Sequence, residues 1–369
     1  MKIFAMCLLG FAASFAPADN PVHEKMAQLV KDGEVPGCVT LVADKDKIID
    51  FAAFGYANIE KSIPMDTNSF FWVASQTKTL TTALFMMLVD EGKVSLDDPV
   101  SKFIPGFENM VVQDKAGNRV KAQTPITMRM LLSHSSGMPP RSPTVPMLDR
   151  YNLERKMVEF LKTPLDSEPG TKYRYSNCGI DTAARVVELI EKRPYEELLQ
   201  ERILTPLGMM DTTFIPDKAQ IARLASVYKS DETKTQFVET KFGAFTYPLD
   251  TPTRAALPSG GIFSSAADMV KFCQMLLNKG VYGGRRYLSA ESVEEMAKRQ
   301  AVEGAPYGLG TMLGNGWFGH AGASGTKMCI YPEEGIITVF MIQRSGDFTF
   351  SRDQVVDIFN AAAFELLKK

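Results

Sequence analysis

The sequence predicts an α+β protein with a central antiparallel sheet of five strands flanked by helices, and with an all-helical subdomain inserted between the two halves of the sheet-bearing part. Two strand-like runs near the N-terminus, 38–43 and 48–54, are separated by a polar turn and indicate a hairpin. Three further runs lie at 316–319, 328–331 and 336–342. Short turns join these runs, which favours antiparallel pairing.

Residues 1–18 have the pattern of a secretory signal. Lys2 gives a positive start, residues 3–16 form an apolar run without charge, and Ala16-Pro17-Ala18 offers a small-x-small cleavage site. The run is too short to span a membrane comfortably, and no later segment has the length of a transmembrane helix. We therefore expect an exported, soluble protein, periplasmic or secreted, whose mature domain spans 19–369.

A first helix is expected at 22–31, where apolar residues recur on one face and Gly33 offers a C-cap. After the hairpin, the segment from 79 to 89 carries no charge and shows apolar residues on every side of a helical projection. A helix that is apolar all round belongs in the middle of a protein. We therefore place a buried helix there, with Ser75 and Lys78 at its start.

The middle of the chain, from about 92 to 252, is rich in proline and glycine. Short helical stretches lie between these residues, at 128–132, 154–161, 180–190 and 195–203. This pattern predicts the inserted helical subdomain and leaves 19–91 and 253–369 for the sheet subdomain. In the last part we expect a helix at 266–277 and a final helix from Ser351, which starts a capping box.

Composition argues against several classes of function. The formal charge is −2, and no basic stripe suggests a nucleic-acid partner. Three histidines offer little for a metal site, and no His-Glu-x-x-His motif occurs. The mature chain keeps four cysteines whose spacing fits neither a metal site nor a disulfide scaffold, so we expect buried free thiols. These cysteines are Cys38, Cys178, Cys273 and Cys329.

Ser75 and Lys78 lie three residues apart at the start of the buried helix, and therefore on one face near exposed main-chain amides. A hydroxyl and an amine at the positive end of a helix dipole could form an alkoxide. The pattern is loose and occurs in two more places, at Ser226/Lys229 and Ser324/Lys327. Only the first copy opens a buried helix, where an unpaired ammonium is costly without a partner or a task.

Other hydrolase mechanisms lack their motifs in this chain. No Gly-x-Ser-x-Gly elbow occurs, which argues against an α/β-hydrolase. A Ser–His–Asp enzyme would need His134 or His320, and neither accompanies a recognisable nucleophile. We interpret His134 as a brace for the turn that follows a helix.

Three motifs follow one another in the chain: Ser75-x-x-Lys78, Tyr175-x-Asn177 and His320-Ala321-Gly322. In this order and spacing they resemble the serine β-lactamase and DD-peptidase superfamily, and most of all its class C branch with the related family VIII-type carboxylesterases. The resemblance extends from about residue 22 to the C-terminus. It implies a β-lactamase/transpeptidase-like fold and an acyl-enzyme mechanism without cofactor or metal.

The resemblance also implies a role for each residue. Ser75 would attack an acyl carbonyl, and a neutral Lys78 would take its proton, because burial lowers a lysine pKa. Tyr175, as phenol or phenolate, would share this proton and pass it to the leaving group; otherwise it is a half-buried aromatic residue with a satisfied hydroxyl. Asn177 would hold the substrate or Lys78. The backbone amides of Ser75 and Ala323 would form the oxyanion hole.

The third motif departs from the lactamase pattern, which has Lys-Thr-Gly where this chain has His320, Ala321 and Gly322. The resemblance places His320 and Gly322 beside the substrate, and glycine lets the backbone approach it closely. A histidine is mostly neutral above its usual pKa of about 6.5, so neutral esters should be held better than carboxylate-bearing β-lactams. Some peptidases of the superfamily also have histidine here.

Our first hypothesis is therefore an exported serine hydrolase that acts on small esters or lactones. The alternative is a DD-peptidase or β-lactamase acting on cell-wall peptides or β-lactams. A third hypothesis is a non-catalytic binding or sensor protein on the same fold. In each case the partner is a small ester, amide or lactam, without nucleic acid or a membrane span, and the oligomeric state is left open.

Overall fold

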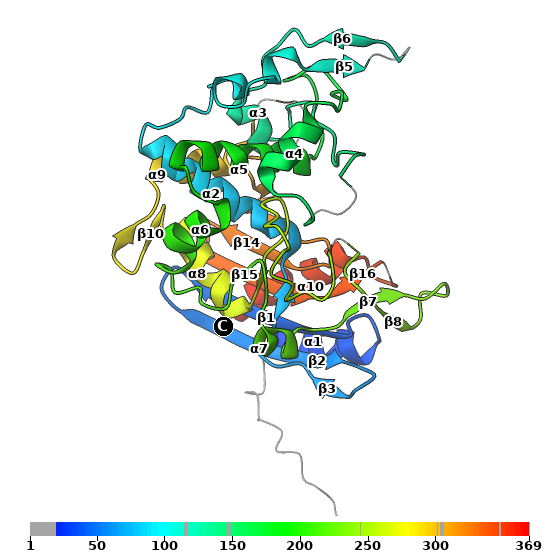
Figure 1. Cartoon of the computed structure of the whole chain (residues 1–369). Coiled ribbons are helices and arrows are strands. Elements are labelled where there is room, and N and C mark those ends of the chain that lie inside the picture. The colour runs from blue at the N-terminus through cyan, green and yellow to red at the C-terminus, as the bar shows by residue number, and fades with distance from the viewer. Residues whose placement is uncertain are drawn as a thin grey trace, which may run out of the picture.

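A seven-stranded antiparallel sheet forms the centre of the protein (Figure 1). The computed structural model describes residues 20–113, 117–145, 149–243, 245–300, 302, 306–346 and 348–368. The strands, in their order across the sheet, are β12 (Met312–Leu313), β13 (Phe318–Ala321), β14 (Lys327–Tyr331), β15 (Ile336–Ile342), β1 (Gly37–Asp44), β2 (Ile48–Asn58) and β3 (Ile63–Pro64).

The five strands predicted from the sequence make up the middle of this sheet, from β13 to β2. The predicted count of five was too low, because β12 and β3 extend the two edges. These edge strands are two residues long, which is too short to show an alternating pattern. The first C-terminal strand was also placed two residues too early, since β13 begins at Phe318 rather than at residue 316.

Both faces of the sheet are covered by helices, and β1 shows how. Val39 and Leu41 belong to one hydrophobic core, whereas Cys38 and Val42 belong to another. This alternation follows from the period of two along a strand. On the second face lie α1 (Pro21–Lys31) and α10 (Arg352–Leu366), and on the first lies α8 (Ala266–Leu277).

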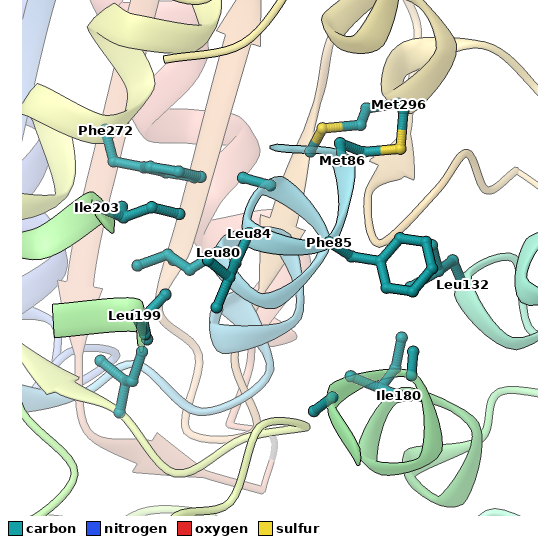
Figure 2. Packing of buried hydrophobic residues seen from close by; sticks show 14 of the residues in the cluster. Leu80, Leu84, Phe85, Met86, Leu132, Ile180, Leu199, Ile203, Phe272 and Met296 are labelled. Atoms are coloured by element: carbon teal, nitrogen blue, oxygen red, sulfur yellow. The ribbon is translucent and has the colours of Figure 1, made fainter. Parts of the chain in front are cut away.

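Helix α2 (Thr77–Asp90) runs through the larger core, with every residue from Thr77 to Leu88 buried. In Figure 2, Leu80 and Leu84 point toward Leu199, Ile203 and Phe272, whereas Phe85 lies near Leu132 and Ile180, and Met86 near Met296. Burying a side chain such as Phe85 stabilises a fold by roughly 1.5–3 kcal/mol. Contacts on all sides therefore fix the helix that carries Lys78.

The middle of the chain contributes helices and also two hairpins, so the prediction of an all-helical insertion was wrong. Its helices are α3 (Met128–Leu132), α4 (Leu153–Phe160), α5 (Asn177–Glu191), α6 (Tyr195–Leu199) and α7 (Lys218–Ala222). Its hairpins are β5–β6 (Val111–Gln113 and Arg119–Lys121) and β7–β8 (Val227–Ser230 and Phe237–Thr240). These strands are three or four residues long and mostly not buried, so they leave no hydrophobic pattern. The division into two subdomains stays a prediction.

Short elements complete the fold. They are β4 (Phe71–Trp72) paired with β9 (Phe263–Ser264), β10 (Val281–Tyr282) paired with β11 (Arg285–Arg286), α9 (Ala290–Ala297), and β16 (Arg344–Ser345), which pairs with β7.

The predicted signal segment, 1–18, lies outside the described residues. Within the described ranges, no helix is long and apolar enough to cross a membrane, and the four cysteines are buried and free.

Candidate active site

Ser75 lies in a tight turn that joins β4 to α2. Ala74, just before it, has φ +49°, a left-handed conformation that a residue with a Cβ adopts rarely and at a cost of about 1–3 kcal/mol. Ala74 and Gln76 are buried, whereas Ser75 is only half-buried. The strained turn therefore leaves the Ser75 side chain accessible while its two neighbours anchor the chain.

Lys78 lies on the first turn of α2, and its side chain is fully buried. Its Nζ donates to Ser75 Oγ at 3.1 Å, to Asn177 Oδ1 at 2.8 Å and to the carbonyl of Ser259. These acceptors match the three donors of an ammonium group. Burial lowers the pKa of Lys78 to about 7, and the charge of Asp181 opposes this decrease. Near neutral pH a large fraction of Lys78 is therefore a neutral amine that can accept a proton.

Tyr175 lies beside both of these groups. Lys78 Nζ is 4.6 Å from the centroid of its ring, and its hydroxyl forms a hydrogen bond with Ser75. Burial raises the pKa of Tyr175, and the bond to Ser75 only partly offsets this increase. Of the two forms that the sequence allowed, the phenol is therefore the one that the surroundings favour at neutral pH.

Asn177 reaches Lys78 because it is the first residue of α5. Ser176 caps this helix by accepting a hydrogen bond from the amide of Gly179 at 3.0 Å. The cap fixes where α5 begins, so the Asn177 side chain points at Lys78 Nζ. Of the two tasks considered for Asn177, the structure places it on the lysine.

His134 braces the segment that carries Tyr175, which agrees with its interpretation from the sequence. The residue follows α3 with φ +60° and is fully buried. Its Nδ1 accepts from the amide of Ser176 at 3.1 Å, and its carbonyl accepts from the amide of Arg174 at 2.8 Å. Burial holds the pKa of His134 well below its usual value, so the ring is neutral.

The ring of His320 lies beside Tyr175, with 6.2 Å between the ring centroids, and two groups of the protein hold it there. Its ring is buried, with Nε2 2.9 Å from the hydroxyl of Tyr307 and Nδ1 2.7 Å from the carbonyl of Ala321. A carbonyl can only accept, so Nδ1 donates to it and Nε2 accepts from Tyr307. Burial lowers the pKa of His320 to about 3. With both nitrogens used, a neutral ring is not available to grip a substrate.

Gly322 brings the end of β13 close to the strand that precedes the serine. A Cβ at this position would lie 2.1 Å from Thr326 Oγ1 and 2.7 Å from the carbonyl of Val73, so no larger residue fits. Ala323 follows and is exposed. Among the described residues, the amides of Ser75 and Ala323 donate to no backbone carbonyl in a turn, loop or cap. The oxyanion hole that the resemblance assigns to these two amides stays a prediction.

Sequence reasoning missed several residues that support the site. Tyr307 holds His320, and the signal that could have found it is the glycine-rich stretch Tyr307-Gly308-Leu309-Gly310. Asp181 lies one helical turn after Asn177, a spacing that places both on one face of α5. Lys156 lies on the buried side of α4, where a lysine needs a partner. Ser259 acts through its main chain, which no side-chain motif reveals.

The site thus contains a serine hydroxyl, a buried amine beside it and a phenol that lies next to both. A family model described as Beta-lactamase matches residues 22–362. The chain belongs to the β-lactamase family. The enzymes of this family are serine hydrolases, so this chain is a serine hydrolase.

Relatives within the family differ in what they are named for. An uncharacterized protein of Mycobacterium tuberculosis is 30% identical over 357 residues, covering 86% of this chain and 88% of that protein. The D-alanyl-D-alanine-carboxypeptidase/endopeptidase AmpH of Escherichia coli is 26% identical over 335 residues, covering 84% and 80%. The solved structure of EstCE1, a hydrolase with promiscuous acyltransferase activity, superimposes with a TM-score of 0.79 at 21% identity, covering 93% and 97%. This last likeness shows the β-lactamase fold.

Proposed function

We propose that the protein is an exported esterase that cleaves small esters or lactones through an acyl-enzyme on Ser75. The observation that supports it best is the 3.1 Å contact between Ser75 Oγ and the Nζ of a buried lysine whose pKa is about 7. A serine hydroxyl is a weak nucleophile until a base removes its proton. Lys78 is close enough to do so, and near neutral pH a large fraction of its amine is unprotonated.

Acylation would begin as Ser75 Oγ attacks the substrate carbonyl carbon and its proton passes to Lys78 Nζ. The carbonyl oxygen becomes an oxyanion that accepts from the amides of Ser75 and Ala323, and each such donor is worth about 3 kcal/mol to the transition state. The bond to the leaving alkoxide then breaks, Tyr175 donates its proton to that oxygen, and Lys78 returns a proton to Tyr175. In deacylation, a water molecule attacks the acyl carbon as its proton passes to the site. The bond to Ser75 Oγ then breaks, Oγ takes a proton back, and the acid is released.

The preference for neutral esters follows from the end of β13, where His320 and Ala321 would form one wall of the substrate site. The ring of His320 is neutral and has both nitrogens bonded within the protein. Ala321 offers a methyl group where the lactamase pattern has a hydroxyl. Neither side chain can pair with a substrate carboxylate, which favours substrates that carry none.

One contact favours the alternative, a DD-peptidase or β-lactamase. The guanidinium of Arg352, on the first turn of α10, donates to the carbonyl of Ala323. It thus places a permanent cation at the end of the same wall, where it could attract a peptide or lactam carboxylate. The name of the Escherichia coli relative points to the same chemistry.

The test is intact-mass analysis of the purified protein after exposure to a fluorophosphonate, a penicillin and an activated ester. Our proposal expects one phosphonate adduct on Ser75, rapid ester turnover and no lasting penicillin adduct. A stable penicillin adduct would favour the alternative, and no adduct with any reagent would favour a binding protein. Ser226→Ala is a matched control, since Ser226 belongs to a second Ser-x-x-Lys copy and its hydroxyl binds Glu239 instead. Export predicts a mature N-terminus at Asp19 in material collected outside the cytoplasm.

A further inference from the structure

A buried ion pair lies near the catalytic lysine. Lys156 from α4 donates to Oδ2 of Asp181 from α5 at 2.8 Å, and their side chains are 1% and 4% exposed. Taking two charges out of water costs free energy, and the attraction between them often does no more than offset this cost, so such a pair is a poor source of stability. Its position therefore calls for another explanation.

The other oxygen of Asp181 reaches the segment that holds Lys78. Oδ1 accepts from the amide of Ser259 at 3.1 Å, and the carbonyl of Ser259 accepts from Lys78 Nζ. Asn177, one turn earlier on α5, accepts from the same Nζ at 2.8 Å. Helix α5 thus holds Lys78 twice, directly through Asn177 and indirectly through Asp181.

Ser259 has neighbours that are fixed without any charge. The hydroxyl of Thr81 on α2 lies 2.7 Å from the carbonyl of Pro258, and Trp72 Nε1 donates to the carbonyl of Gly260 at 2.7 Å. Neutral hydrogen bonds therefore already anchor this segment on both sides of Ser259. What Asp181 adds to them is a negative charge close to the lysine.

We propose that Asp181 is a positioning residue for the serine hydrolase reaction, and that it acts together with Lys156 to set the charge state of Lys78. A lone carboxylate would hold Lys78 as an ammonium, which cannot act as a base. Paired with Lys156, the carboxylate still orients Ser259 but attracts the lysine proton less. This inference rests on the proposed function, because it concerns the same site.

Five titratable groups near this cluster are neutral at neutral pH, whereas Glu159 on α4 and Arg185 on α5 are charged and paired with other residues. Burial lowers the pKa values of two histidines and raises those of three hydroxyl or thiol groups: His134, His320, Tyr175, Tyr195 and Cys178. Among the described residues, Asp181 is the charged group that acts on the pKa of Lys78. The balance between Asp181 and Lys156 is therefore open to a direct test.

The experiment removes each charge separately while it keeps a polar side chain of similar shape. The readout is the second-order rate constant of Ser75 labelling by a fluorophosphonate. It is measured from about pH 5 to about pH 10, a window that brackets the pKa of Lys78 at about 7. The acid limb of this profile is the pH range in which the labelling rate rises as Lys78 loses its proton. Lys156→Gln leaves the Asp181 carboxylate uncompensated, so it should move the acid limb to higher pH by at least about half a unit. Asp181→Asn leaves the cation uncompensated and should move the limb downward by a similar amount.

A double variant, Asp181→Asn with Lys156→Gln, should return the limb to the wild-type position. Lys102→Gln removes an exposed cation from its pair with Asp98 and serves as the matched control, with no shift expected. Shifts of both single variants in one direction, or slower labelling at every pH with an unmoved limb, would overturn the proposal.

Circular dichroism establishes which variants fold. If the single variants do not fold, the double variant decides, and a limb displaced from wild type by more than about half a unit contradicts the proposal. Absence of Ser75 labelling in the wild-type protein is a different result, since it overturns the proposed function itself.

Discussion

The side-chain oxygen of Asn177 lies 2.8 Å from the buried amine of Lys78, so the helix that carries the asparagine also sets the environment of this amine. Asn177→Asp would put a carboxylate in this place. An opposite charge at such a distance raises a lysine pKa by about 1–3 units, so the acid limb of kcat/KM should move upward by at least about one unit. A pH–rate profile with an activated ester measures this shift, and an unmoved limb would show that Lys78 is not the base.

Loss of the Ser75 hydroxyl should abolish turnover. If the site residues act as a unit, Ser75→Ala lowers kcat by a factor on the order of a million. Ser226→Ala changes an equivalent sequence motif at a position that pairs with Glu239, and it should retain full activity. Steady-state kinetics of both variants on one ester separate the two copies, and substantial turnover by Ser75→Ala would refute the assignment.

Burial of Lys78 should make stability depend on pH. Its pKa is about 7 in the folded protein and about 10.4 in an unfolded chain, so between these values the unfolded state binds more protons. The free energy of unfolding should therefore rise with pH in this window, by about 1.4 kcal/mol per unit relative to a variant without the amine. Lys78→Met supplies that reference, and urea titrations at several pH values measure the difference. A constant difference between the two proteins would mean that Lys78 stays protonated in the folded protein over this pH range.

Gly322 should not tolerate a side chain. In Gly322→Ala the new Cβ would meet Thr326 Oγ1 and the carbonyl of Val73, and the strand end would have to move away from Ser75. Displacement of Ala323 weakens one oxyanion donor, so kcat should fall by about 100-fold or more. Gly243→Ala is the control, because nothing lies within 4 Å of a Cβ there. Equal activity of the two variants would contradict the proposed oxyanion hole.

The buried helix and the Ser75–Lys78 pair could be predicted because their signal is local. An uncharged apolar run predicts burial, and a spacing of three residues places two side chains on one helical face. The central strands were predictable for the same reason, since β1 is a short and almost continuous apolar run that ends at a polar turn. Two-residue strands such as β3 carry no such pattern.

The supporting contacts could not be predicted because they join distant segments. Lys156 and Asp181 come from different helices, and nothing near either residue in the sequence indicates the other. The hydrogen bond that holds His320 was missed for the same reason, since its partner Tyr307 lies in a loop and the pair forms only when that loop packs against β13. Burial then decides the charge of each group, and burial is a property of the whole fold.

The acceptors around Lys78 include Asn177 and Ser259, which lie 99 and 181 residues away along the chain. No proteolytic fragment holding only one of these stretches can assemble an active centre, and a nascent chain acquires one only after its last third has docked. The time at which activity returns during refolding would therefore report when the long-range contacts are complete. These contacts form slowly because closing large loops is entropically costly. Hydrolytic activity is therefore absent from the extended chain and arises only when the distant segments have come together.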